Sequence, residues 1–316
     1  MSNGNILQKY DLKLQGLQEE KGEIKLNDLR LLLNAVTKLT EATSRLVATG
    51  VSQGRDKPRW LQESLNFTVK KIKKGSTVLE VEAPCLMDVA EEQFGQKEFW
   101  REPAKEDDTA LDLAGYAIQE ILSDEGTGDR YDSVIIDAAL GLKKVAKDVG
   151  ATFSLTPKGG QTSKVTLKPE DYDRIASKKA ALPEAKSFTV SGRLEVIKHS
   201  SGQFVLELTD GQKLLGKLDL EFLNQADLKE LWGKEVTTEG MVSFKENGQA
   251  RLIRARKLML KADGDEIFQE LPQLDQQDLF KEEGELRGSE EATKPMQLWG
   301  LWGGDESIEE LLNELK

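Results

Sequence analysis

Cysteine and histidine set the first limit on the chemistry that this sequence can perform. The chain contains one cysteine, Cys85, and one histidine, His199. A structural zinc site needs about four Cys or His ligands, and a disulfide bond needs two cysteines. A Cys–His nucleophilic pair would have to join these two residues, which lie in different predicted domains and have no flanking signature. We therefore interpret Cys85 as a small buried residue and His199 as a turn residue.

Carboxylates are numerous, and some lie close enough in sequence to suggest a magnesium site. The candidates are Asp107 with Asp108, Asp171 with Asp173, and the group Asp129, Asp132 and Asp137. No spacing typical of a nuclease or hydrolase surrounds them, and Asp107 and Asp108 precede a predicted helix whose N-terminal dipole they would stabilise. The segment PKGGQTSK lacks the spacing of a phosphate-binding loop and predicts a hairpin turn. The sequence therefore predicts a non-enzymatic protein with no metal and no cofactor.

The net charge of −12 belongs to one end of the chain. Residues 263–316 hold four basic and sixteen acidic residues, whereas residues 1–262 are close to neutral. A block of like charge resists compaction and is typical of an acidic interaction tail. Burying one of its tryptophans would contribute on the order of 2 to 3 kcal/mol, and the acids favour a basic docking surface. The predicted partner-binding residues are Trp299, Trp302, Asp305, Glu306, Ile308, Leu311 and Leu312.

The elements that must position these residues follow from hydrophobic periodicity. Residues 1–180 show strands and helices in local clusters, which favours an α+β domain over a doubly wound sheet. A strand at Tyr10–Leu14 and a short extended piece at 23–26 precede a long helix from the N-cap Asn27 to Gly50. A hairpin, a loop or frayed helix at 91–108, two helices, a second hairpin and a short helix follow. The second of the two helices is expected to continue to Val149.

Residues 187–262 have a different order: three strands, one helix and two strands. This succession resembles the five-stranded Greek-key barrel called the OB fold, in which the helix lies between the third and fourth strands. Gly192 and Gly240 fall within strands, at points where a barrel must bend sharply. An SH3-like or other small barrel is the alternative.

An OB-like barrel offers a second function, because such barrels commonly bind single-stranded nucleic acid across the second and third strands and the adjacent loops. The basic residues on and beside these strands are accompanied by few aromatic residues on which bases could stack. They could equally be solvated charges that protect an exposed edge strand. The candidate nucleic-acid-binding residues are Phe204, Lys213, Lys217, Lys245, Arg251, Arg254 and Arg256. Lys70, Lys71, Lys73 and Lys74 form a second basic patch that is also typical of a polar turn.

The end of the tail, LWGLWGGDESIEELLNELK, resembles the acidic C-terminal tails of some bacterial antitoxins and of uncharacterised proteins associated with them. These tails often run Trp-Pro-Gly-Asp-Glu-Ser and then a short helix rich in Glu and Leu. The matching residues are Trp302, Gly304, Asp305, Glu306, Ser307, Glu309, Glu310 and Leu311, with Gly303 in place of proline. The resemblance implies bacterial origin and a neutralising or partner-binding role.

The sequence thus predicts a cytoplasmic interaction protein, since no apolar run approaches the roughly 18 to 20 residues that span a bilayer. Its expected parts are an α+β domain at 1–180, an OB-like barrel at 187–262 and a partner-binding tail at 263–316. The expected partner is a basic protein such as a toxin, a nuclease or another effector of a defence system. The alternatives are that the tail folds back on residues 1–262, and that the barrel binds single-stranded nucleic acid and is shielded by the tail. A third alternative is an enzyme that uses carboxylates converging from distant segments.

Overall fold

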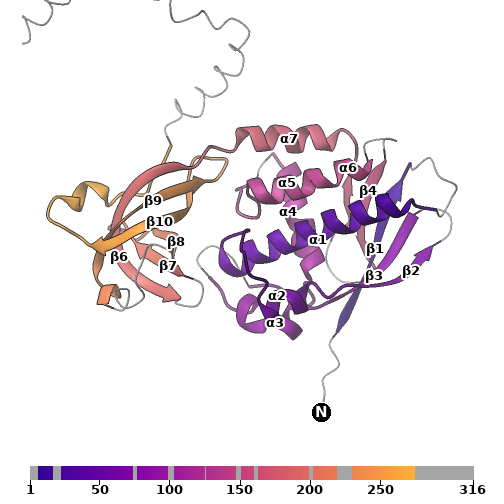
Figure 1. The fold of residues 1–316 in the computed structure, drawn as a ribbon, viewed down its shortest axis with the longest axis horizontal. Helices are drawn as coiled ribbons and strands as arrows, with labels where there is room; N and C mark the ends of the chain where they lie inside the picture. The colour runs from indigo at the N-terminus through magenta and orange to yellow at the C-terminus, as the bar shows by residue number, and fades with distance from the viewer. Residues whose placement is uncertain are drawn as a thin grey trace, which may run out of the picture. The chain divides into compact units, whose positions relative to one another are not determined.

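The computed structural model describes residues 6–16, 23–73, 77–98, 103–124, 126–146, 151–159, 163–198, 202–218 and 230–274. The fold is α+β, as the sequence predicts, and it contains an antiparallel sheet with helices and a closed β-barrel (Figure 1). We call the elements from β1 to α7 the α+β part and those from β6 to β10 the barrel. The described residues of both belong to one compact unit, which extends to Gln273.

The α+β part is built on a five-stranded sheet with strand order β2-β3-β1-β4-β5. Its strands are β1 (Leu7–Gln15), β2 (Thr68–Lys73), β3 (Thr77–Pro84), β4 (Thr152–Pro157) and β5 (Val165–Leu167). Its helices are α1 (Leu26–Thr49), α2 (Arg59–Ser64), α3 (Leu86–Phe94), α4 (Ala110–Leu122), α5 (Ser133–Gly141), α6 (Lys143–Ala146) and α7 (Asp171–Ala181). The central strand β1 pairs antiparallel with both β3 and β4.

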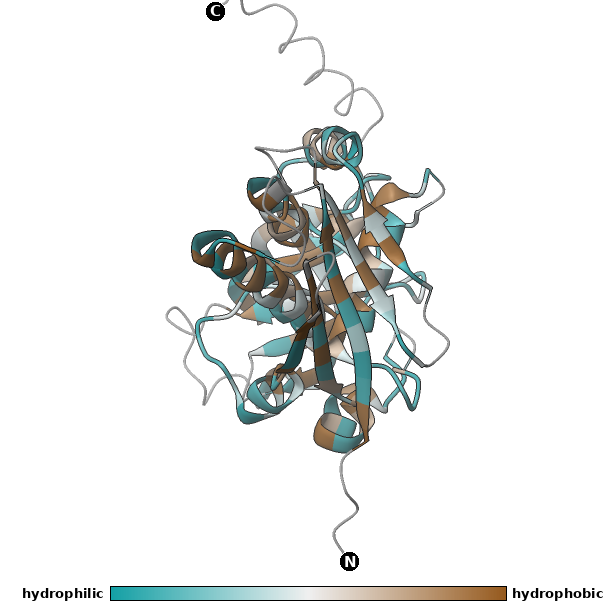
Figure 2. Ribbon diagram, turned by 90° about the vertical axis from the view of Figure 1, so that its right-hand side faces the viewer, coloured by the Kyte–Doolittle hydropathy of each residue, from teal (hydrophilic) through white to brown (hydrophobic). Residues whose placement is uncertain are grey.

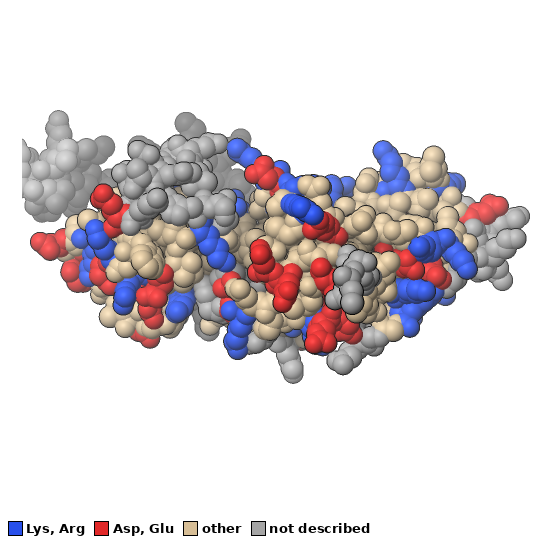
Figure 3. All heavy atoms as spheres, turned by 90° about the horizontal axis from the view of Figure 1, so that it is seen from below, with Lys and Arg blue, Asp and Glu red and all other residues tan. Residues whose placement is uncertain are grey.

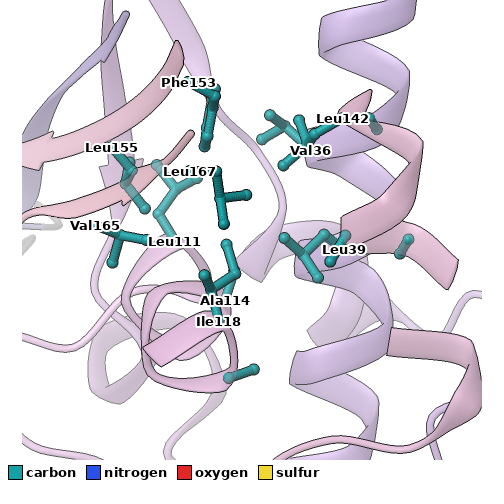
Figure 4. Packing of buried hydrophobic residues seen from close by; sticks show 14 of the residues in the cluster. Val36, Leu39, Leu111, Ala114, Ile118, Leu142, Phe153, Leu155, Val165 and Leu167 are labelled. Carbon is teal, nitrogen blue, oxygen red and sulfur yellow. The ribbon is translucent and has the colours of Figure 1, made fainter. Parts of the chain in front are cut away.

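One face of this sheet forms a core with the helices. Tyr10, Leu12 and Leu14 of β1 are buried because strand alternation points them to the same side, where they join residues of α1, α4 and α5. Figure 4 shows that the α4 side chains lie between the strands β4 and β5 and the α1 side chain Leu39. Figure 2 shows the corresponding apolar stripe along the helices. The predicted stripe of the long helix is therefore core.

The opposite face of the sheet carries ion pairs between neighbouring strands. Lys158 lies 3.1 Å from Asp11 and 2.5 Å from Glu80, and Lys70 lies 3.0 Å from Glu82. Such cross-strand pairs each contribute little in water.

The barrel consists of β6 (Lys186–Lys198), β7 (Gln203–Glu207), β8 (Lys213–Leu218), β9 (Glu235–Phe244) and β10 (Ala250–Leu260). Its closed order is β10-β8-β7-β6-β9, with antiparallel pairs except for the parallel pair of β8 and β10. This connectivity is compatible with an OB-like barrel, and the five predicted strands are confirmed. The first three residues of the predicted helix at 227–233 lie outside the described residues; of the other four, Glu230 and Leu231 are helical and Trp232 and Gly233 form a turn.

Glycines occupy the places where the barrel backbone approaches itself. A Cβ atom on Gly240 would overlap the carbonyl oxygen of Arg254 and lie 2.8 Å from the Cα atom of Ala255. The ladder between β9 and β10 is irregular between Ala255 and Lys257, next to this approach. The predicted bend at Gly240 therefore coincides with a bulge in the partner strand.

Candidate functional site

The outer face of β7, β8 and β10 carries two parallel rows of side chains. Gln203 pairs with Lys217, and Lys217 pairs with Arg254, so these three residues form a polar row across the strands. Two residues away on each strand, Val205 pairs with Leu215, which pairs with Leu252, and these three form an apolar row. Side chains point alternately into and out of the barrel along a strand, so residues two positions apart share a face. Both rows lie on the outer face. We refer to them as the polar row and the apolar row.

The end of α1 covers the apolar row. Val51, which follows α1, forms one buried cluster with Val205, Leu215 and Leu252. Beside it, the Gln203 side chain donates from Nε2 to the carbonyl oxygen of Thr49, one of the last carbonyls of α1, which have no partner within the helix. This half of the face is therefore occupied by the chain itself.

The turn between β9 and β10 is held by charged contacts with the α+β part. Glu246 accepts hydrogen bonds from the Tyr131 hydroxyl at 2.6 Å and from Lys178 Nζ at 2.8 Å. Lys245 Nζ lies 2.6 Å from Asp129 Oδ1. Burial alone would raise the pKa of Asp129, but the hydrogen bonds from Lys245 and Thr127 prevail and lower it.

Arg251 joins the start of β10 to the loop before α5. Its Nη2 donates to the carbonyl oxygens of Gly128 and of Tyr131, the latter at 2.6 Å, and its Nη1 donates to that of Asp129 at 3.3 Å. Its Nε is buried and has no hydrogen-bond partner among the described residues. Burial lowers the pKa of the guanidinium, although Asp132 and Asp129 oppose this effect. Arg251 is therefore committed to contacts within the chain.

The other two residues of the polar row are more open. Lys217 is half-buried and Arg254 is exposed, and no carboxylate of the described residues forms an ion pair with either. Desolvation lowers the pKa of Lys217, and the nearby cations Arg254 and Arg45 lower it further. Arg45 itself is buried on α1, where it binds Glu41 at 3.3 Å and the carbonyl oxygen of Asp56.

The candidate nucleic-acid-binding residues are thus placed very differently. The Phe204 side chain is 0% exposed and lies inside the barrel, where its ring packs against Gly216, so the expectation that bases could stack on it is wrong for this conformation. Lys245 and Arg251 are engaged by the α+β part, as described above. Lys213, Arg254 and Arg256 are exposed, and Lys217 is half-buried. Sequence reasoning missed Arg45, Val51 and Gln203, because nothing in their local pattern indicates long-range contact.

Several of the carboxylates considered for magnesium have structural partners. Asp132 is the N-cap of α5, Asp137 binds Lys179 at 2.7 Å and Asp173 binds Lys143 at 3.0 Å. Asp107 and Asp108 directly precede the N-cap of α4, as expected, and the end of the helix also has a capping box, in which Thr109 is the N-cap and Asp112 the partner. Within the described residues, no group of three or more His, Cys, Asp or Glu side chains could hold a metal ion.

A buried polar network joins β1 to this capping box. The Tyr10 hydroxyl donates to Asp112 Oδ2 and lies 2.9 Å from Thr109 Oγ1, and burial followed by the charge of Asp112 raises the pKa of this phenol. Asp112 also accepts from the backbone N–H of Thr109 at 2.9 Å. The network contains a buried phenol and a buried carboxylate, which are groups that often act in catalysis. Here their donors and acceptors are satisfied by each other.

We expect the substitution Tyr10→Phe to lower the free energy of unfolding by about 2 kcal/mol, because a charged buried acceptor loses a donor. Urea unfolding followed by circular dichroism measures this loss. Tyr172→Phe is the matched control, since the buried Tyr172 hydroxyl has no hydrogen-bond partner among the described residues and its removal should cost nothing. Equal losses in the two variants would contradict the assigned role of the network.

Several predicted features lie outside the described residues. These are His199, the end of the predicted helix at Gly150, and all seven tail residues predicted to bind a partner. No helix in the described ranges has the length and apolar character needed to cross a membrane. Cys85 is buried, as expected, and burial raises the pKa of its thiol. Comparison with known proteins gives no match to any family model, curated protein or solved structure.

Proposed function

We propose that this chain is a non-enzymatic interaction protein that binds a basic protein partner through residues 263–316. The observation that supports this proposal is the segregation of charge: sixteen acidic and four basic residues lie in this segment, while the remainder is nearly neutral. A segment with such an excess of negative charge attracts a cationic surface over several ångströms and accelerates the encounter.

Ion pairs in the folded part support the same contrast between an acidic tail and a near-neutral body. Ion pairs join neighbouring strands on the face of the sheet opposite the helices, and Lys178 and Asp129 bind the β9–β10 turn. Basic and acidic side chains lie interspersed over the face shown in Figure 3. The folded part therefore carries both signs of charge in balance, and the tail, which holds the whole net charge of −12, is the stronger candidate for contact with a cationic partner.

The tail also carries the apolar groups that a stable complex needs. Trp299 and Trp302 lie among acids and glycines, and Ile308, Leu311 and Leu312 would form one stripe of a short helix. A helix of that length is marginal alone, so we expect it to form on contact with the partner. Charge would then set the rate of association, and the two indoles would supply most of the affinity.

The partner class follows from the resemblance to antitoxin tails. We infer a basic effector of a toxin–antitoxin or defence system, such as a toxin or nuclease, whose cationic site normally receives nucleic acid or another anionic substrate. The tail would occupy that site and neutralise the effector. Single-strand binding by the barrel is less favoured, because Phe204 is inside the barrel and Lys245 and Arg251 already bind the α+β part.

The test is affinity capture from a bacterial lysate followed by reconstitution with the purified captured protein. We expect the double variant Trp299→Ala, Trp302→Ala to weaken the equilibrium affinity by about 100-fold, because each anchor contributes more than about 1.4 kcal/mol. We also expect the association rate measured by stopped flow to fall roughly tenfold or more between low and high salt.

Trp232→Ala is the matched control, because Trp232 is a 66% exposed tryptophan of the barrel and should not contribute to this contact. Capture that persists in the double variant, or an association rate that does not respond to salt, would refute the proposal. Loss of capture with Trp232→Ala alone would move the binding surface to the barrel.

A further inference from the structure

The polar row contains a lysine that is partly buried and has no counter-charge among the described residues. Lys217 lies on the outer face of β8, is half-buried beside the end of α1, and makes no ion pair with a described carboxylate. The charged groups near it from the neighbouring elements are Arg254 of β10 and Arg45 of α1, both of which are cations. The other neighbour in the row, Gln203 of β7, is neutral.

Three other lysines with partly buried side chains have carboxylate partners. Lys158 binds Asp11 and Glu80, Lys178 binds Glu246 at 2.8 Å, and Lys245 binds Asp129 at 2.6 Å. Removing a cation from water without a partner is unfavourable, and proteins usually avoid it. Lys217 differs from these three, since no carboxylate of the described residues pairs with it, and a partly buried cation of this kind is characteristic of a site that receives an anion.

The register brings a second cation within reach of the same anion. Lys217 and Arg254 are direct partners in the parallel ladder of β8 and β10, and adjacent strands lie about 4.8 Å apart. Both side chains leave the same face of the barrel, and Arg254 is exposed. Arg45 shares the carboxylate of Glu41 with Lys57, so the positive charge of Arg45 is only partly compensated and adds to that of the row. Within the described residues, Lys217 and Arg254 themselves contribute close to two unpaired positive charges.

We propose that Lys217 and Arg254 form a binding site for a phosphate monoester group. A phosphate monoester carries a charge of about −1.5 to −2 at neutral pH and presents three acceptor oxygens, which matches two adjacent cations better than a single carboxylate does. The apolar neighbours Val205 and Leu215 are covered by Val51, and Phe204 faces inward, so nucleobases have no aromatic platform here. The site therefore recognises the phosphate itself. This inference is independent of the tail.

The experiment is isothermal titration of the full chain with inorganic phosphate at constant ionic strength. We expect Lys217→Met and Arg254→Met each to weaken binding about tenfold, because each loses a charge-assisted hydrogen bond. Lys213→Met is the matched control, since Lys213 is exposed four residues earlier on the same strand and should leave affinity unchanged. Lys217→Arg keeps the charge and should retain binding, which separates loss of the ligand group from damage to the fold.

Lysine acylation read by mass spectrometry gives a second, site-resolved measurement. We expect phosphate to reduce the acylation rate of Lys217 several-fold and to leave that of Lys213 unchanged. The proposal is overturned if chloride at the same ionic strength protects Lys217 equally, or if Lys213→Met weakens binding as much as Lys217→Met. It is also overturned if an oligonucleotide without terminal phosphate, or a peptide of residues 274–316, occupies the site while inorganic phosphate does not.

Discussion

Replacing Arg251 by methionine is expected to lower the free energy of unfolding by about 3 kcal/mol, because three backbone carbonyls lose a shared cationic donor. The guanidinium of Arg251 contacts the carbonyl oxygens of Gly128, Asp129 and Tyr131, and no other described side chain donates to them. Its position at the start of β10 means that the loss weakens the contact between the barrel and the α+β part. Urea unfolding measures the free energy, and limited proteolysis measures whether the two parts separate.

Arg256→Met is the control for this prediction. Arg256 lies on the same strand but is exposed, and it forms no ion pair with a described carboxylate, so its loss should change stability little. Lys replacement of Arg251 should recover only part of the loss, because an ammonium group cannot reproduce the planar fork of a guanidinium. Equal stability of Arg251→Met and Arg256→Met would show that the carbonyl contacts do not hold the two parts together.

The substitution Gly240→Ala is expected to cost about 3 kcal/mol or more. The added methyl group would overlap backbone atoms of Arg254 and Ala255, which cannot move aside by rotating a side chain. The strand β10 would have to shift away from β9, and β10 also closes the barrel through its pairing with β8. A large fall in the urea midpoint, with the loss confined to the barrel in hydrogen exchange, is the expected result.

Gly159→Ala provides the comparison, because a Cβ atom at Gly159 would have no heavy atom within 4 Å. We expect this variant to be as stable as the original chain, or slightly more stable through reduced freedom of the unfolded state. If Gly240→Ala were equally well tolerated, the close approach of β9 and β10 would have to be wrong.

The barrel was predictable because its signals are local. Turn residues such as Asp210 and Gly211 separate runs of alternating apolar residues, and these runs became β7 and β8. The long stripe of α1 was predictable for the same reason, although its start was not. Lys25, rather than Asn27, is the N-cap, and the helix begins at Leu26 inside the segment expected to be extended.

Short helices were harder to predict, because few residues reveal their period. The segment 91–108 was expected to be a loop or a frayed helix, but α3 already begins at Leu86 and reaches Phe94, with a non-helical residue at Ala90 that breaks the pattern. The helix expected to run from Val134 to Val149 is divided at Leu142 into α5 and α6. Apolar periodicity continues across that break and conceals it.

The candidate site depended on information that periodicity does not contain. The sequence identified Lys217 and Arg254 as basic residues, but their adjacency arises from the parallel pairing of β8 with β10, which lie far apart in the chain. The sequence also gave no indication that Val51 would cover the apolar row or that Gln203 would bind the end of α1. Residue type was therefore predictable, whereas pairing and occlusion required the three-dimensional fold.

The burial of Cys85 has a consequence for how this protein meets oxidants. The thiol is 1% exposed, lies 3.9 Å from the carbonyl oxygen of Asp107, and has a pKa raised by burial. Alkylating and oxidising reagents attack the thiolate, and they reach it only in molecules where the junction of β3 and α3 has opened. The rate at which the Cys85 thiol of the native protein reacts with such a reagent therefore measures the equilibrium between the closed and open states of that junction.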